Sequence, residues 1–238
     1  MLKQELIEKN PIRHLKGESD AHESSRMGLV MARAGVGKTA LLVQIAMDSL
    51  LNDKQVVHVS VGQSLDKTKL WYDDMFKDIA ESCKLDKAGE IHDTIMRNRM
   101  IITFNESTFS LAKLEERLHD LVQQNVIKPK CMVVDGFDFI KTDRSVLEGM
   151  REMARGMDLQ IWFSAVCDEE TTDTLSAVVA PAPCTGMEDL FNTVVLLQPV
   201  PKSDCLDLKI IKGSAAVSKC GKLLKLDPRT FMIREDCK

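Results

Sequence analysis

The sequence predicts an α/β fold of three layers, in which helices cover both faces of a mainly parallel β-sheet that ends in antiparallel strands. Three observations support this prediction. Apolar, strand-like runs alternate with amphipathic, helix-like segments from residue 27 to residue 166, which is typical of right-handed β-α-β units. A glycine-containing turn separates the first strand-like run from the first helix-like segment. The last apolar runs follow one another without long helices between them, which favours antiparallel pairing at the C-terminal edge.

The elements of the first half are predicted from hydrophobic periodicity. Residues 1–26 are polar and charged with a short helical pattern at their start, so we interpret them as a lead-in to a single domain over 27–238. We expect strands at 27–31, 56–61 and 100–104, and helices at 37–51, 65–83 and 88–97. The helix at 65–83 should bury one side, formed by Leu70, Met75, Phe76, Ile79 and Ala80.

The second half continues the alternation and then changes character. We expect helices at 111–124 and 144–157, and strands at 131–134 and 159–166. Residues 168–189 are acidic and contain two prolines, and they are interpreted as a long loop. Further strands are expected at 193–197, 207–211, 222–226 and 231–233.

Composition limits the class of protein. The chain has 238 residues, of which 44% are hydrophobic, enough for a sizeable core. Its net charge of −4 gives no overall attraction to nucleic acid or anionic membranes. The seven cysteines form no C-x-x-C pair, so we expect reduced thiols rather than a zinc site. The N-terminus lacks a signal-like apolar run, and no stretch reaches the ~18 apolar residues of a membrane span. A cytoplasmic protein without membrane contact is therefore expected.

A phosphate-binding loop is predicted at residues 32–39, which read Ala-Arg-Ala-Gly-Val-Gly-Lys-Thr. This run fits the Walker A pattern except that Ala32 replaces the first glycine. Small residues allow backbone amides to converge on phosphate oxygens, and the following helix adds its positive end. Lys38 would contact the β- and γ-phosphates, and the Thr39 hydroxyl would ligate Mg²⁺. The predicted nucleotide-binding residues are Arg33, Ala34, Gly35, Val36, Gly37, Lys38, Thr39 and Ala40.

A second feature is the apolar run at residues 131–134 that ends in Asp135. This is the form of a Walker B strand, whose aspartate holds magnesium, usually through water. Thr39 and Asp135 are therefore the predicted metal ligands, and ATP and Mg²⁺ the predicted cofactors.

These motifs resemble the RecA-like ATPases, above all the DnaB-type replicative helicases and KaiC. The likeness covers residues 27–233. It lies in Ala32-Arg33, Gly37-Lys38-Thr39-Ala40 and Ile45-Ala46 of the loop, in Val57-His58-Val59-Ser60 of the second strand, in Val133-Val134-Asp135, and in Leu206 to Gly213 of a late strand. The resemblance implies a three-layer RecA-like P-loop NTPase fold that binds ATP.

The chain departs from that family at its catalytic positions. Gly62 stands where the family has the glutamate that polarises the attacking water, and Gln63 follows it. A glutamine orients water but cannot accept a proton near neutral pH. The fifth strand offers only Ser164 where the family commonly has a polar sensor such as glutamine. The arginine of the family's Lys-x-Arg element is absent after Lys212.

These losses predict weak catalysis. A missing general base lowers the rate by about 10²- to 10⁴-fold, and a missing arginine finger by a further ~10³ to 10⁵. Lys38 would still stabilise transition-state charge, and Gln63 is the candidate for positioning water. Asp66, Asp138 and Asp168 are candidate replacement acids, although each is better interpreted as a surface or turn residue.

Three functions remain open from the sequence. The first is a nucleotide-dependent switch or scaffold that hydrolyses ATP slowly or not at all and is recognised by an unidentified protein partner. The second is an active DnaB-like ATPase that works as a hexamer on nucleic acid, although the acidic 168–189 loop should repel phosphates. The third is a MinD-like ATPase that dimerises through Arg33. A homo-oligomer, dimeric or hexameric, is the association that these resemblances imply.

Overall fold

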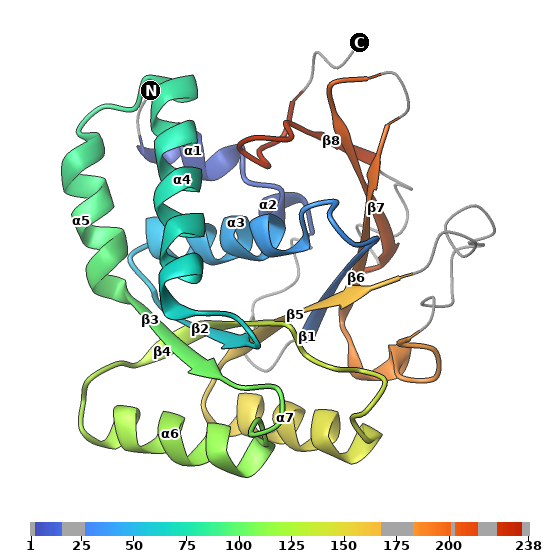
Figure 1. The fold of residues 1–238 in the computed structure, drawn as a ribbon. Coiled ribbons are helices and arrows are strands. Elements are labelled where there is room, and N and C mark those ends of the chain that lie inside the picture. The colour runs from blue at the N-terminus through green and yellow to red at the C-terminus, as the bar shows by residue number, and fades with distance from the viewer. Residues whose placement is uncertain (1–2, 16–26, 168–182, 201–202, 214–222, 235–238) are drawn as a thin grey trace.

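The computed structural model describes residues 3–15, 27–167, 183–200, 203–213 and 223–234. Within these residues the strands form one eight-stranded sheet in the order β3-β2-β4-β5-β1-β6-β7-β8 (Figure 1). The first six strands of this order are parallel, and β7 and β8 join them antiparallel. The mainly parallel sheet with an antiparallel C-terminal edge is therefore confirmed.

The strands coincide closely with the apolar runs. Their bounds are β1 Met27–Ala32, β2 Gln55–Val61, β3 Arg99–Phe104, β4 Pro129–Asp135, β5 Gln160–Val166, β6 Thr193–Pro199, β7 Leu206–Lys212 and β8 Leu223–Leu226. Central strands are apolar on both faces because helices cover both. In β4, Cys131 and Val133 belong to one core cluster, whereas Met132 and Val134 belong to the other.

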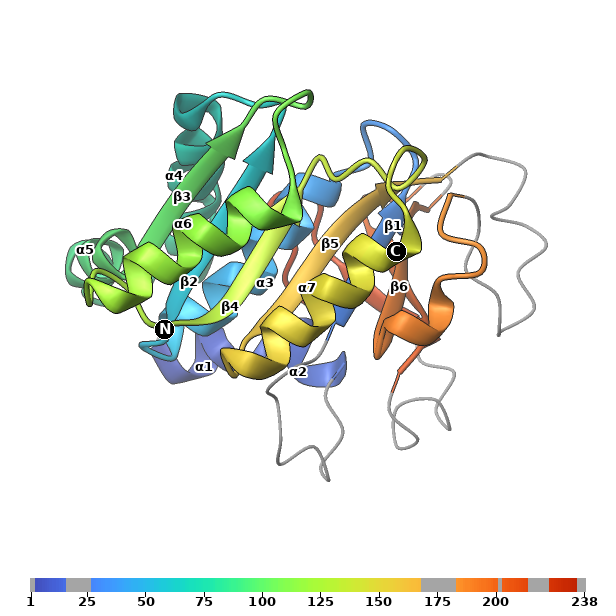
Figure 2. The ribbon, with the colours of Figure 1, turned by 90° about the horizontal axis from the view of Figure 1, so that it is seen from below.

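Helices cover the two faces of the sheet (Figures 1 and 2). On one face lie α1 Lys3–Glu8, α2 Ile12–Leu15, α3 Lys38–Leu51, α4 Leu65–Cys83 and α5 Ala88–Asn98. On the other lie α6 Leu111–Gln123, α7 Arg144–Gly156 and the short 3₁₀ helix η2 Glu188–Leu190. The sheet and its two helical coverings make the three layers that the sequence predicted.

Local signals explain several helix ends. The Ser64 side chain accepts a hydrogen bond from the amide of Lys67 and so caps α4, and Ser110 caps α6 in the same way. Such caps satisfy amides that have no partner inside the helix. Helix α4 ends at Lys84, which takes the left-handed conformation typical of a C-terminal cap.

The described part of the N-terminal lead-in, residues 3–15, is part of the packed structure. Leu6, Ile7, Ile12 and Leu15 are buried in the same core cluster as α3. Arg13 forms an ion pair of 2.7 Å with Asp48 of α3, whose side chain is almost fully buried. The polar composition of residues 1–26 conceals this packing because apolar residues are few but consistently placed.

Two sequence predictions are wrong in detail. Leu70, expected on the buried side of α4, is 58% exposed, and Tyr72 takes a buried place instead. Residues 231–233 form no strand; only an isolated bridge joins Leu226 and Ile233. The cause is a turn in which the Asp227 carboxylate accepts the amides of Arg229 and Thr230.

The cysteines differ in part from the expected set of reduced thiols. Among the described residues, Cys83, Cys131, Cys167 and Cys184 form no disulfide, but Cys205 is disulfide-bonded. Cys220 and Cys237 lie outside the described residues. Composition could not reveal this bond, because a disulfide depends on the spatial distance between two Cα atoms.

Candidate functional site

The 32–39 loop joins the end of β1 to the start of α3 at the carboxyl edge of the sheet. Its backbone turns at Gly35 and Gly37, with φ angles of 79° and 110°. The second value is strained for any residue with a side chain. Gly37 is the N-cap residue of α3 and makes no side-chain cap. The first amides of the helix therefore lack a capping side chain, an arrangement that suits an anion.

Lys38 folds back over this loop. Its ammonium donates a hydrogen bond of 3.2 Å to the carbonyl oxygen of Arg33. Burial lowers the pKa of Lys38, and the nearby Asp135 carboxylate opposes part of this effect. The Lys38 ammonium is partly desolvated and donates to an uncharged carbonyl. It would bind an anion more strongly, because hydrogen bonds between charged groups are stronger than those to neutral acceptors.

The centre of the site is the Asp135 carboxylate, which two hydroxyl groups contact. Thr39 Oγ1 at the start of α3 donates to Asp135 Oδ2 at 2.7 Å. Ser164 Oγ of β5 donates to Asp135 Oδ1 at 2.6 Å. Asp135 is only 5% exposed. The structure thus brings together two residues predicted as metal ligands and the serine noted on the fifth strand.

Polar residues of β2 extend this group sideways. Ser60 pairs in register with Asp135 across the parallel ladder and accepts a hydrogen bond of 3.3 Å from Thr68 of α4. Deeper in the sheet, His58 Nδ1 lies 3.0 Å from the Tyr72 hydroxyl. Burial lowers the pKa of His58 from 6.5 to about 4. His58 is therefore a neutral, packed residue.

The C-terminal turn also contacts the loop. A Cβ built on Gly37 would lie 2.5 Å from the Phe231 ring, so the ring packs directly on this glycine. Phe231 is buried and has a positive φ of 54°. An ion pair of 2.7 Å between Arg229 and Asp78 ties the turn to α4. Sequence reasoning missed the contact between Gly37 and Phe231, because about 190 residues separate the two and no local pattern signals their contact.

A carboxylate from β3's end occupies the space beside Gly62. A Cβ built on Gly62 would lie 2.7 Å from Glu106 Oε1 and 3.0 Å from its Cγ. Gly62 has a φ of 75°, and its amide donates to the Phe104 carbonyl at 2.9 Å. Glu106, which follows the third strand, was not among the candidate acids from the sequence, which follow the second, fourth and fifth strands.

The remaining candidates lie apart from the centre. Gln63 lines a polar cavity of about 320 Å³ together with Asn105 and Arg117. Lys212 donates to the Glu188 carbonyl at 2.7 Å. Asp138 holds a turn by accepting the amides of Ile140 and Lys141.

Two other predicted features are the candidate acid Asp66 and the acidic residues of the 168–189 segment. Asp66 is exposed in the first turn of α4. In the 168–189 segment, Asp189 forms an ion pair with Arg144. Asp168, Glu169, Glu170 and Asp173 lie outside the described residues.

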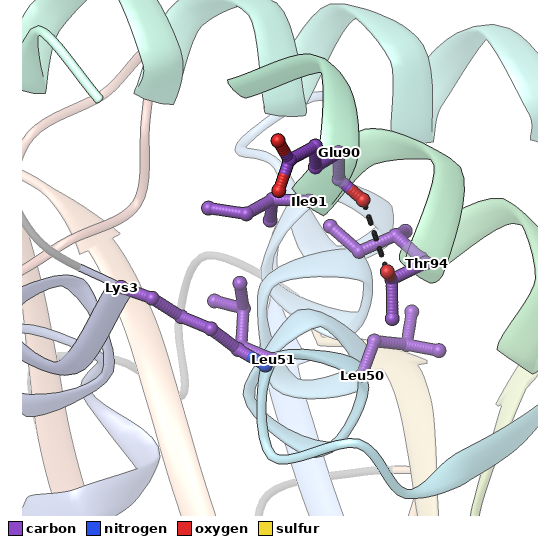
Figure 3. A pocket seen from close by; sticks show the side chains of 7 residues that line it. Lys3, Leu50, Leu51, Glu90, Ile91 and Thr94 are labelled. Atoms are coloured by element: carbon purple, nitrogen blue, oxygen red, sulfur yellow. Dashed lines mark hydrogen bonds between the residues drawn. The ribbon is translucent and has the colours of Figure 1, made fainter. Parts of the chain in front are cut away.

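Another cavity lies at the opposite end of α3 (Figure 3). It has a volume of about 140 Å³ and is lined by Leu50, Leu51, Ile91 and neighbouring residues. Thr94 there donates to the Glu90 carbonyl at 2.9 Å. Since α3 has 14 residues, it is about 21 Å long. This cavity is therefore separate from the 32–39 loop.

The described part of the chain was compared with the requirements of a metal site and of a membrane-spanning helix. There, no group of three or more His, Cys, Asp or Glu side chains could hold a metal. The oxygen donors gathered beside the 32–39 loop are the Asp135 carboxylate and the hydroxyls of Thr39 and Ser164. Mg²⁺ fits such a set, because it typically takes one or two carboxylates together with substrate phosphates and waters. Within the same residues, none of the helices has the length and apolarity needed to cross a membrane.

Comparison with protein-family models gave no match, and comparison with curated protein sequences gave no significant match either.

Proposed function

We infer that this chain binds ATP with Mg²⁺ at the 32–39 loop, hydrolyses it slowly, and acts as a nucleotide-dependent switch or scaffold with a RecA-like fold. The observation that carries the proposal is the 2.7 Å hydrogen bond between Thr39 and Asp135. It joins a hydroxyl at the start of a helix to a strand-end carboxylate 96 residues away. Thr39 would hold Mg²⁺ directly and Asp135 through water, and the cation would neutralise phosphate charge.

The loop supplies the rest of a triphosphate site. The amides at the start of α3 and the positive end of the helix favour phosphate oxygens. Lys38 now donates to the Arg33 carbonyl, and a phosphate oxygen would be a stronger, charged acceptor in its place. Adenine is preferred over guanine by family resemblance, since the sequence lacks an Asn/Thr-Lys-x-Asp motif.

Slow hydrolysis is supported by what surrounds the site. The Lys212 ammonium donates a hydrogen bond to the Glu188 carbonyl on the far side of β6, and Gly213 and Ser214 follow Lys212 where the family element has its arginine. The Ser164 hydroxyl donates its hydrogen bond to Asp135. These contacts direct neither the Lys212 ammonium nor the Ser164 hydroxyl towards the negative charge that develops on the γ-phosphate during hydrolysis. A protein with tight binding and slow turnover persists in its ATP state, which is the property a switch needs.

The other two functions stay predictions. An oligomeric ATPase acting on nucleic acid and a dimer joined through Arg33 would share the same loop chemistry. They differ in the association that ATP induces.

Isothermal calorimetry with ATP and Mg²⁺ tests the proposal. Lys38→Ala should weaken binding roughly ten- to a hundredfold, because hydrogen bonds to charged groups contribute about 1.5–3 kcal/mol. Lys69→Ala, a change of the same type at an exposed position of α4, should leave binding unchanged. If folded protein takes up no adenine or guanine nucleotide in the presence of Mg²⁺, the proposal is wrong.

A further inference from the structure

The carboxyl end of β2 lacks a side chain at Gly62, and a carboxylate from the neighbouring strand lies in the vacant space. Glu106 Oε1, Cδ and Cγ would lie 2.7, 3.3 and 3.0 Å from a Cβ at Gly62. The Glu106 carboxylate therefore reaches from the connection after β3 to the position where a side chain on β2 would begin. This contact depends on glycine, because any Cβ at Gly62 would displace Glu106.

The backbone holds the two strand ends together. The pairing of β2 with β3 continues through Val61 and Phe104, and the Gly62 amide extends it by donating to the Phe104 carbonyl at 2.9 Å. Glu106 follows two residues later. Its position is thus determined by the sheet rather than by a long free loop.

The same strand end adjoins the strand that carries Asp135. Ser60 pairs with Asp135 between β2 and β4, and a Cβ at Gly136 would lie 2.3 Å from the Val61 carbonyl oxygen. Glu106 and Asp135 therefore lie at the same edge of the sheet, on either side of the end of β2. Glu106 is solvent-exposed, so water has access to its carboxylate.

We propose that Glu106 is the residue that orients and deprotonates the water attacking the γ-phosphate, in place of a side chain on β2. This inference rests on the proposed function. The water oxygen forms a bond to the γ-phosphorus, the bond from that phosphorus to the β-phosphate oxygen breaks, and ADP leaves. The water proton passes to the Glu106 carboxylate and from there to solvent. The products are ADP and inorganic phosphate, so atoms and charge balance without another reactant.

The experiment measures binding and hydrolysis separately on the full chain with ATP and Mg²⁺. Glu106→Gln should keep the wild-type Kd within about twofold, since Glu106 does not belong to the 32–39 loop. Its single-turnover rate of phosphate release should fall about 10²- to 10⁴-fold, the usual effect of losing a general base. Glu116→Gln, the same change at an exposed position of α6, should leave both quantities unchanged.

A second readout separates proton transfer from a structural role. Formate should restore part of the rate in Glu106→Ala, because a small carboxylate can enter the space that the truncation opens, and acetamide at the same concentration should not. Hydrolysis at the wild-type rate in Glu106→Gln, or no hydrolysis by a wild-type protein that binds ATP, overturns the role of Glu106 and leaves ATP binding intact. Absence of ATP binding by the wild type overturns both.

Discussion

At the residue scale, the site is organised around the buried Asp135 carboxylate and the two hydroxyl groups that contact it. Asp135 accepts one hydrogen bond on each oxygen, from Thr39 and from Ser164. A hydroxyl has one proton and two lone pairs. Thr39 can therefore continue to donate to Asp135 while a lone pair faces a cation. On the proposed function, binding of Mg²⁺ beside Thr39 would require no break in this contact.

Alanine is expected to destabilise the protein at Gly37 but not at Gly89. Gly37→Ala should lower the free energy of unfolding by about 1–3 kcal/mol, because alanine is strained at a φ of 110° and its Cβ would overlap the Phe231 ring. The control is Gly89→Ala in α5, where a Cβ meets no atom within 4 Å. There alanine should be neutral or stabilising by up to about 1 kcal/mol.

Urea unfolding of the two variants checks this, and calorimetry with ATP adds a second measure. Gly37→Ala should also bind ATP more weakly, since the same strain displaces the first amides of α3. Equal stability of the two alanine variants would show that neither the φ angle nor the Phe231 contact constrains the loop.

At the element scale, buried polar contacts connect β2 to α4 behind the site. His58 bonds to the Tyr72 hydroxyl, and the Arg99 guanidinium lies 4.4 Å from the centre of the Tyr72 ring. Burial raises the pKa of Tyr72 and lowers that of His58. Both side chains are therefore neutral in the folded protein, and they hold α4 in place beside the carboxyl end of β2.

This contact predicts a pH dependence of stability. The pKa of His58 is about 4 when folded, against an ordinary 6.5. The unfolded chain therefore binds the extra proton first, so the His58 contribution is complete above pH 6.5 and is lost as the pH falls towards 4. The slope cannot exceed about 1.4 kcal/mol per pH unit for one proton. The groups that act on His58 are Asp135, which opposes the shift, and Arg99, which adds to it.

Urea unfolding at several pH values between 7 and 4 measures this slope. His58→Gln, which keeps a hydrogen-bonding side chain without the titration, should show a smaller slope over the same range. His92, half-exposed on α5, provides the control, and His92→Gln should retain the wild-type slope. An identical slope in wild type and His58→Gln would mean that other groups cause the acid sensitivity.

At the scale of the whole molecule, the sequence predicts the helices and strands that have a periodic apolar pattern, but it does not predict contacts between segments that are distant in the chain. Helix α4 was predicted with its observed bounds, Leu65–Cys83, because a continuous apolar periodicity marks it locally. The contacts of Glu106 with Gly62 and of Phe231 with Gly37 join distant segments, and no periodicity encodes them. Leu70 was misplaced because it lies off the i, i+3, i+4, i+7 spacing that Tyr72 shares with Met75, Phe76 and Ile79.

The N-terminal helices complete the core on the α3 side of the sheet. Leu6 of α1 is 1% exposed and packs in the α3 cluster, whereas Leu70 of α4 is 58% exposed. Leu6→Ala should lower the free energy of unfolding by about 2–5 kcal/mol, the usual cost of a buried leucine truncation. Leu70→Ala should change it by less than about 0.5 kcal/mol, as for other surface substitutions.

Urea unfolding of the two alanine variants compares the same chemical change at two sites that the sequence pattern ranks in the opposite order. That pattern assigns Leu6 to a polar lead-in and Leu70 to a buried stripe. A large loss of stability in Leu70→Ala with little change in Leu6→Ala would favour the pattern and contradict the packing of α1 on α3. The expected result would instead make residues 3–15 an integral part of the domain, because α1 then stabilises the helix whose first turn contains Lys38 and Thr39.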